Sequence, residues 1–228
     1  MSISKGEPWG RPAGGPADLV VEGGDDALAR AVAAHPHARI AFSPAHGSDL
    51  ARAVGLSEVS TNTTELPCDA LQVELDGVAH TAVNMVVVGV PPDRQRWWTR
   101  ASRIVVQVDD RVVHAGDAVA IVAASGQYLR GADVVPRGHP GDGRIEVQVY
   151  AVARRERATM RSRLPLGTHV PHPRIRSVTG RRVEVRATGF PFRHGAGRPL
   201  EVEVDGVPAT AARVVMVAVA PAAFTLLV

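Results

Sequence analysis

The feature that most constrains the fold is a series of short apolar segments running from residue 66 to the C-terminus. Many of them alternate apolar and polar residues, as Val183–Arg186 and Glu201–Val204 do, and this period of two is typical of half-buried strands. Asp-Gly pairs such as Asp76-Gly77 and Asp205-Gly206 lie between them, and Asp-Gly in this position indicates a β-hairpin. Residues 66–228 are therefore predicted to form an antiparallel β-sandwich, or alternatively a barrel.

The segments with the strand pattern can be given individually. They are Leu71–Leu75, Thr81–Val88, Ile104–Val108, Val119–Ala124, Ile145–Tyr150, Arg181–Ala187, Leu200–Val204, Val214–Ala218 and Phe224–Val228. Pro221 interrupts the C-terminal apolar run, which favours two strands over one helix there. The last strand either completes the sandwich or returns to the N-terminal part of the chain.

The N-terminal part shows a different pattern. A strand over residues 17–22 leads through glycines into a helix over 27–34, and a strand over 39–42 leads through a turn into a helix over 50–54. This repeated unit predicts a small α/β lobe over residues 17–65. Residues 1–16 are rich in Gly and Pro and are expected to be a flexible leader. The predicted fold class is α+β, with this lobe followed by the larger sandwich.

Charge excludes one class of function. The chain has 26 Lys and Arg residues against 23 Asp and Glu, a formal net charge of +3, and the positive charge is spread along the sequence. Nucleic-acid-binding proteins usually concentrate it on one face or tail, so no nucleic-acid partner is expected. The densest arginine cluster, residues 154–163, is interpreted as a solvated helix or loop, with contact to phospholipid headgroups as the alternative.

Two further features bear on surroundings and partners. Cys68 is the single cysteine, so a disulfide cannot form within the chain and a reducing cytoplasm is the simplest location. Peripheral contact with the inner membrane face is the alternative that a lipid partner would bring. Trp97-Trp98 is interpreted either as a cap on an exposed edge of the core or as a patch that faces lipid or a protein partner.

Three segments, in order, resemble the lipid kinase family that includes the diacylglycerol kinases and shares its fold with NAD kinase. Val20–Leu28 resembles a strand followed by Gly-Gly-Asp-Gly-Thr-Leu. Ile40–Gly55 resembles a strand followed by Pro-x-Gly-Thr-Gly-Asn-Asp-Phe-Ala-Arg. Residues 123–149 resemble Asn-Gly-x-Tyr-x-Gly-Gly-Gly and a later Asp-Gly-x-Leu-Asp-Val. The resemblance implies a nucleotide-binding α/β lobe and a C-terminal β-sandwich lobe.

The resemblance also implies a site for ATP and Mg²⁺. In the family, main-chain amides of the glycine turn approach the nucleotide phosphates, which requires residues without a Cβ. The nucleotide-binding positions carried over are Gly23, Gly24, Asp25, Gly47, Ser48 and Asp49. Asp25 and Asp205 are the catalytic candidates, Glu146 is an alternative base to Asp205, and Asp142 is either a metal ligand or an ordinary hairpin-turn residue.

The sequence departs from the family pattern at three chemically important positions. Asp26 replaces the third glycine of the turn, Ala27 replaces the threonine, and Val207 stands where the family places an acidic residue that serves as a base. A carboxylate where phosphate binds is repulsive, and valine cannot accept a proton. His46 lies in the second loop and is interpreted as a surface residue.

These departures leave several functions open. One is a catalytically impaired homologue that acts as a binding or scaffold protein. A second is an active ATP- and Mg²⁺-dependent diacylglycerol or lipid kinase that transfers the γ-phosphate to a lipid hydroxyl. A third is an unrelated β-rich binding module. The expected partners are a lipid or membrane surface and a second copy of the chain, because the family's first strand–helix segment has no counterpart before Val20 and an uncovered sheet edge favours self-association.

Overall fold

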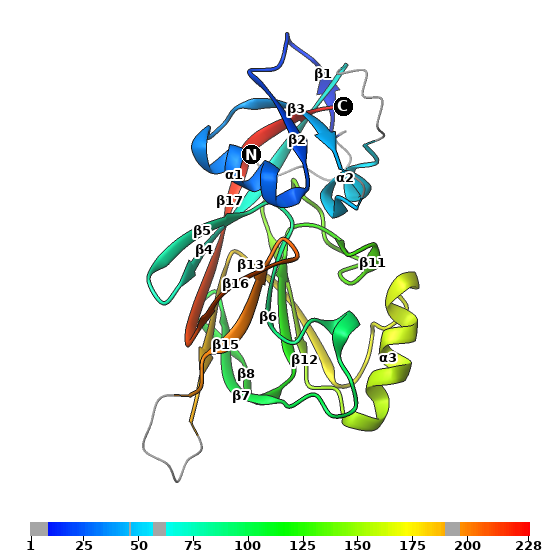
Figure 1. Ribbon diagram of the computed structural model, residues 1–228, viewed down its shortest axis with the longest axis vertical. Coiled ribbons are helices and arrows are strands. Elements are labelled where there is room, and N and C mark those ends of the chain that lie inside the picture. The colour runs from blue at the N-terminus through cyan, green and yellow to red at the C-terminus, as the bar shows by residue number, and fades with distance from the viewer. Residues whose placement is uncertain (1–8, 46, 57–62, 190–196) are drawn as a thin grey trace.

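The computed structural model describes residues 9–45, 47–56, 63–189 and 197–228. The chain forms two lobes stacked along its long axis, with a small α/β lobe at one end and a larger β-sandwich at the other (Figure 1). The predicted fold class is therefore confirmed. Residues 1–8 of the expected leader and His46 lie outside the described residues.

The small lobe is built from two parallel strand–helix units. Strand β2 (Leu19–Gly23) precedes helix α1 (Asp25–Ala34), and β3 (Arg39–Pro44) precedes α2 (Asp49–Val54). β2 pairs in parallel with β3, and β3 pairs in parallel with the end of β17 (Val214–Leu227). Apolar side chains of the helices and strands, among them Leu28, Ile40 and Leu50, are fully buried between these elements.

The sandwich consists of two sheets around one apolar core. The first sheet has the order β1 (Arg11–Pro12), β4 (Thr64–Leu75), β17, β14 (Arg182–Ala187), β7 (Ser102–Val108) and β8 (Arg111–Ala118), with β5 (Val78–Ala82) paired to β4. The second has the order β13 (Ile175–Gly180), β12 (Ile145–Tyr150), β9 (Ala120–Ala124), β6 (Met85–Gly89), β15 (Leu200–Val204) and β16 (Val207–Ala212). The inward-facing side chains, mostly Val, Ile and Leu, bury one another as the period of two requires.

A third layer covers the outer face of the second sheet. It contains helix α3 (Arg157–Arg163), the short helices η1 (Pro92–Arg94), η2 (Arg154–Glu156) and η3 (Leu164–Leu166), and the hairpin of β10 (Tyr128–Leu129) and β11 (Ala132–Asp133) (Figure 1). Met160 and Leu164 pack with Tyr150 in a separate apolar cluster. Among the described residues, every helix is too short or too polar to cross a bilayer.

Two long strands join the lobes. β4 and β17 pair antiparallel from the sandwich into the small lobe, and the register shifts between Ala220 and Phe224. We expected two strands here, and the structure instead has one continuous strand with an irregularity at Pro221. Proline lacks an N–H for the strand ladder. Beside it, the Asp69 carboxylate accepts hydrogen bonds from the N–H groups of Ala222 (2.9 Å) and Gly143 (2.6 Å).

Two other predictions about the strands were wrong for identifiable reasons. The predicted single strand 81–88 is broken between β5 and β6, because the intervening N–H groups donate to Asp205 instead of a neighbouring strand. Strands β8, β13 and β16 were not predicted at all. Each lies at the edge of its sheet. β8 and β13 carry several polar residues because one side is open to water, whereas β16 consists mostly of small residues and contains Pro208, so it lacks the apolar alternation of a strand.

The arginine cluster and the tryptophan pair lie in the third layer. The cluster forms η2 and α3, and its arginines are mostly exposed, as interpreted from the sequence, although Arg157 is buried. The interpretation of Trp97 and Trp98 as a cap on the core was wrong. Their side chains are 67% and 61% exposed, so they cover little of the core.

Candidate functional site

The glycine turn at the start of α1 has the tight geometry that its sequence predicts. Gly23 has φ of +130°, and a Cβ there would lie 2.9 Å from the Cβ of Ala27. Gly24 is the N-cap of α1, and no described side chain caps the first amides of this helix. Uncapped amides at a helix N-terminus favour an anionic group, so the turn retains a shape suited to phosphate.

Asp26 changes the charge at this turn. One of its carboxylate oxygens lies 2.9 Å from Nη1 of Arg30, one helical turn away. The other lies only 3.0 Å from where a Cβ on Gly24 would be. The carboxylate is therefore directly beside the glycine turn, and the exposed Arg30 side chain neutralises it only in part because solvent screens such pairs.

Asp25 is buried and joins three segments of the chain. Its carboxylate accepts hydrogen bonds from Ser48 Oγ (2.5 Å), Asp49 N (3.2 Å), Leu50 N (3.1 Å) and Asn84 Nδ2 (3.4 Å). Burial raises the pKa of Asp25, and the charge of Asp49 adds to this effect, while the hydrogen bonds from Ser48 and Leu50 oppose it. Three of these donors share Oδ2 and only Ser48 Oγ binds Oδ1, so Oδ1 keeps one of the roughly four acceptor positions of an ionised carboxylate.

The second loop is also occupied by structural contacts. Ser48 Oγ caps α2 by accepting the N–H of Ala51 at 3.1 Å. The buried Asp49 carboxylate accepts the N–H groups of Arg130 (2.5 Å) and Gly131 (2.7 Å). Gly47 has φ of +96° and open space around its Cα. The structure thus brings all of the predicted nucleotide-binding residues to one end of the small lobe.

Asn84 is the contact between this group and the sandwich. Its side chain is 1% exposed, and Nδ2 donates to Tyr128 O at 3.0 Å as well as to Asp25. Within the described part of the chain, its Oδ1 is buried without a hydrogen-bond donor. A Cβ on Gly126 would come within 2.0 Å of this oxygen, so the backbone at Gly126 approaches Asn84 as closely as glycine allows.

Asp205 lies beside Asn84 at the turn between β15 and β16. Its carboxylate accepts the N–H groups of Val83 (2.8 Å), Asn84 (3.0 Å) and Met85 (3.0 Å). Burial raises the pKa of Asp205 to about 7, and the nearby charge of Asp25 acts in the same direction, although the three N–H groups favour the ionised form. One acceptor position of this carboxylate remains, and a pKa near neutrality suits a group that exchanges a proton.

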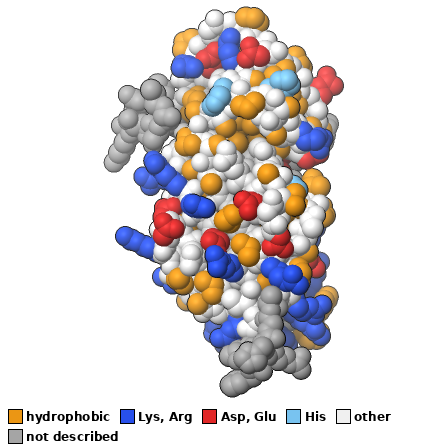
Figure 2. Space-filling model, turned by 90° about the vertical axis from the view of Figure 1, so that its left-hand side faces the viewer, with side chains coloured by type: hydrophobic (Ala, Val, Ile, Leu, Met, Phe, Trp, Pro, Cys, Tyr) orange, Lys and Arg blue, Asp and Glu red, His pale blue; other side chains and the backbone are white. Residues whose placement is uncertain are grey.

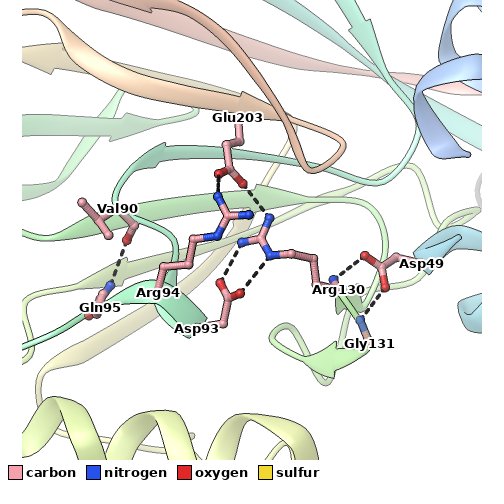
Figure 3. A network of polar contacts seen from close by, with 8 residues as sticks. All are labelled: Asp49, Val90, Asp93, Arg94, Gln95, Arg130, Gly131 and Glu203. Carbon is pink, nitrogen blue, oxygen red and sulfur yellow. Dashed lines mark hydrogen bonds and ion pairs between the residues drawn. The ribbon is translucent and has the colours of Figure 1, made fainter. Parts of the chain in front are cut away.

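An ion-pair network that the sequence did not reveal extends from this site (Figure 3). The Arg130 guanidinium binds Asp93 with two hydrogen bonds of 2.8 Å and binds Glu203 with one of 2.8 Å, and Arg94 binds the other oxygen of Glu203 at 2.7 Å. Because Arg130 N also donates to Asp49, the network connects η1 to the small lobe. Charged residues this far apart in sequence carry no local signal of pairing.

Two predicted residues lie outside the group around Asp25. The Asp142 carboxylate accepts Arg144 N at 3.0 Å within its own turn. Burial raises the pKa of neighbouring Asp69, and the charge of Asp142 acts in the same direction. Glu146 accepts the Thr179 hydroxyl at 2.7 Å. It lies on β12, separated from β15 by β9 and β6, which places it roughly 14 Å from the Asp205 turn at the usual strand spacing.

The described residues do not contain three His, Cys, Asp or Glu side chains that could hold a metal ion by themselves. A Mg²⁺ ion that accompanies a nucleotide usually takes only one or two carboxylates, its other ligands being phosphate oxygens and water. Asp25 Oδ1 and Asp205 Oδ2 each accept a single hydrogen bond, so each carboxylate keeps one acceptor position. Val207, at the position of the family's base, is 47% exposed at the start of β16.

The two-lobed architecture, a small α/β lobe followed by a larger antiparallel β-sandwich, is that of the NAD kinase-like β-sandwich class. Residues 95–228 match the family model of the YegS C-terminal NAD kinase beta sandwich-like domain. The chain belongs to this family, within the diacylglycerol kinase and NAD kinase-like group, and the predicted resemblance is confirmed.

Solved structures show the same fold. A diacylglycerol kinase from Bacillus anthracis is similar with a TM-score of 0.67 and 16% identity, over 92% of this chain and 76% of that one. A yeast NADH kinase complexed with NADH is similar with a TM-score of 0.52 and 12% identity, over 92% of this chain and 62% of that one. The curated proteins contain no match to the sequence.

Proposed function

We propose that this chain is a catalytically impaired member of the lipid kinase group that acts by binding, as a scaffold or adaptor, rather than by phosphoryl transfer. The observation that carries the proposal is the environment of Asp25. Its two oxygens accept four hydrogen bonds, which hold the N-terminus of α2 and the side chain of Asn84. This carboxylate stabilises the interlobe structure, and most of its acceptor positions are used within the chain itself.

Two further features support the proposal. The Asp26 carboxylate beside Gly24 opposes a triphosphate, and one unit charge at about 4 Å costs roughly 1 kcal/mol in water and about 4 kcal/mol near a protein surface. The pairing with Arg30 places this penalty toward the lower end of the range. Val207 cannot serve as a base, and Ala27 provides no hydroxyl for hydrogen bonding.

One observation favours an active kinase as the second candidate. Asp205 has a pKa raised to about 7 by burial and one free acceptor position, so it is suited to take the proton of a lipid hydroxyl that attacks the γ-phosphorus of ATP. In that function Gly23 and Gly24 would hold the phosphates. Mg²⁺, when bound with the nucleotide, would neutralise the charge of the transferred phosphoryl group.

A thermal unfolding experiment with ATP and Mg²⁺ distinguishes the two candidates. A ligand present at 100 times its Kd stabilises a protein by about 2.7 kcal/mol, which corresponds to a rise in Tm of roughly 5–10 °C for a chain of this size. We expect less than about 1 °C for the native sequence at millimolar ATP, because the turn carries the Asp26 charge. We expect a clear rise for the double variant D26G/A27T, which restores the family's glycine turn.

The control is Asp117→Asn, which removes an exposed negative charge from β8 at the far side of the sandwich. It should leave the ATP effect unchanged. A shift of 5 °C or more in the native protein, or phosphate transfer from ATP to diacylglycerol in mixed micelles by the purified native chain, would contradict the proposal and favour the active kinase.

A further inference from the structure

A pair of adjacent tryptophans projects from the third layer of the structure. Trp97 and Trp98 are the two central residues of a turn, in which Thr99 N donates to Arg96 O at 3.1 Å and Arg96 N donates to Thr99 Oγ1 at 2.8 Å. The two rings meet edge to face with centroids 5.4 Å apart, and both are mostly exposed. Two large aromatic side chains presented together to water indicate a contact surface.

The turn is held in place by a buried arginine. Arg157 on α3 is 4% exposed, and its Nη1 donates to the carbonyl oxygens of Arg96 (3.0 Å) and Thr99 (2.6 Å), one on each side of the tryptophans. Its Nε donates to Val152 O at 3.2 Å. Three main-chain carbonyl oxygens thus accept from this buried guanidinium, and two of them fix the turn against α3.

Positive charge surrounds the pair. A hollow of about 430 Å³ beside the tryptophans is lined by arginines from the turn and from η2 and α3, namely Arg96, Arg154, Arg155 and Arg161. Within the part of the chain that the structure describes, Nη1 of Arg161 is buried without a hydrogen-bond acceptor. The neighbouring acid, Glu156, is shared between Arg174 at 3.3 Å and Arg155 at 3.9 Å. The hollow therefore has a net positive charge and an unpaired donor.

The opposite side of the molecule carries both kinds of charge. Figure 2 shows the side facing away from α3, where positive and negative side chains are interspersed with apolar ones over most of the face and positive ones gather toward its lower end. What distinguishes the surface near α3 is the combination of two exposed tryptophans with surrounding arginines, in a chain whose net charge is only +3.

We propose that the tryptophan–arginine surface, formed by Arg96, Trp97, Trp98, Arg154, Arg155 and Arg161, docks on an anionic phospholipid bilayer. Tryptophan prefers the headgroup region of a bilayer because its ring is apolar and its N–H is polar. Arginines beside it are attracted to the negative leaflet. The inference goes beyond the proposed function and requires no kinase activity.

The size of the apolar patch favours a membrane over a protein partner. Each tryptophan can bury roughly 150–250 Å², whereas a stable protein–protein interface buries about 1,200–2,000 Å² in total. A few aromatic anchors with surrounding arginines are sufficient for peripheral membrane binding, where two modest attractions act together.

The surface is also connected to the interlobe site. Asp93 and Arg94 of η1 immediately precede the tryptophan turn and bind Arg130 and Glu203, and Arg130 N binds Asp49 (Figure 3). A bilayer bound at the tryptophans would therefore lie close along the chain to η1, where the polar network that reaches the small lobe begins.

Vesicle binding tests the proposal with the intact chain and without nucleotide. The native protein should co-sediment with vesicles of phosphatidylcholine and phosphatidylglycerol, and only weakly with phosphatidylcholine alone. Trp97→Ser combined with Trp98→Ser should weaken binding roughly tenfold or more, and R154Q/R155Q about fivefold for each arginine removed. The matched control R181Q/R182Q removes two exposed arginines from the sandwich and should bind as the native protein does.

Fluorescence provides a second readout. Trp9, whose Nε1 donates to Pro67 O at 2.9 Å, remains in the double serine variant. Anionic vesicles should shift the emission of the native protein to the blue and leave that of the variant unchanged. Since the substituted tryptophans are exposed, the Tm of the double serine variant should lie within about 1 °C of that of the native protein. If the double serine variant is less stable than this, vesicle binding by R154Q/R155Q tests the proposal in its place.

Three results would overturn the proposal. The first is no binding of the native protein to anionic vesicles, and the second is equal binding by the native protein and both variants. The third is a dimer that dissociates in the double serine variant while vesicles bind neither protein, which would assign the surface to a second copy. The vesicle assay contains no ATP and the thermal-shift assay contains no lipid, so the failure of one proposal is distinguishable from the failure of the other.

Discussion

Replacing Asp25 by alanine tests whether this carboxylate is a structural clamp. The substitution removes the acceptor for Ser48 Oγ, Asp49 N, Leu50 N and Asn84 Nδ2. Asn84 keeps its bond to Tyr128 O, and the Ser48 hydroxyl can rotate toward another acceptor. The two amides at the N-terminus of α2 are fixed in direction, and they are left buried without a partner.

The expected cost follows from those two amides. A buried donor without a partner costs about 1–3 kcal/mol, so Asp25→Ala should lower the free energy of unfolding by about 3–5 kcal/mol and the Tm by roughly 6–20 °C. Asp25→Asn should cost only about 1 kcal/mol. Its oxygen can still accept both amides, its Nδ2 can donate to the Ser48 hydroxyl, and the buried charge is gone.

Urea unfolding followed by circular dichroism measures both variants. Asp26→Asn, on the same helix but at an exposed position paired with Arg30, is the control and should cost no more than about 1 kcal/mol. The reasoning is refuted if Asp25→Ala costs less than about 1 kcal/mol, or if Asp25→Asn is as damaging as Asp25→Ala. The second outcome would mean that the negative charge, and not the accepted hydrogen bonds, is what the site requires.

Two other predictions concern the same region. Gly126→Ala should lower the free energy of unfolding in urea by about 2–4 kcal/mol, because its Cβ would lie 2.0 Å from Asn84 Oδ1. The control Gly14→Ala, whose Cβ would lie 3.7 Å from Glu65 Oε1, should be nearly neutral. Equal effects of the two substitutions would contradict the close approach of Gly126 to Asn84. The raised pKa of Asp205, about 7 against roughly 3.9 in the unfolded chain, means that the folded state holds the extra proton between pH 4 and 7. Its contribution to stability is therefore present at low pH and is lost as the pH rises toward 7, by up to about 1.4 kcal/mol per pH unit. Asp205→Asn should flatten this part of the plot of unfolding free energy against pH. An unchanged slope in the variant would contradict a raised pKa.

The local sequence was sufficient to predict most elements of the sandwich interior. Strands such as β9 and β12 lie in the middle of a sheet and carry continuous or alternating apolar residues, so their identity is visible in a few neighbouring positions. Edge strands such as β8 and β13 were missed because solvent on one side relaxes that requirement. One residue of the sequence indicated the break between β5 and β6, namely Asn84, which is a polar residue within the apolar run 81–88. The structure shows that the strand is interrupted there.

The sequence by itself determined the two-lobed class of fold, the hairpin turns, and the glycine turn with its altered residues Asp26 and Ala27. These features depend on periodicity, turn chemistry and motif order, which are properties of neighbouring residues. Tertiary structure alone decided what the carboxylates do. Asp25 finds Ser48 across 23 positions, and Asp205 finds Asn84 across 121. An acid's role depends on which donors fill its lone pairs and how deeply it is buried, and both are set by segments that meet only when the chain has folded.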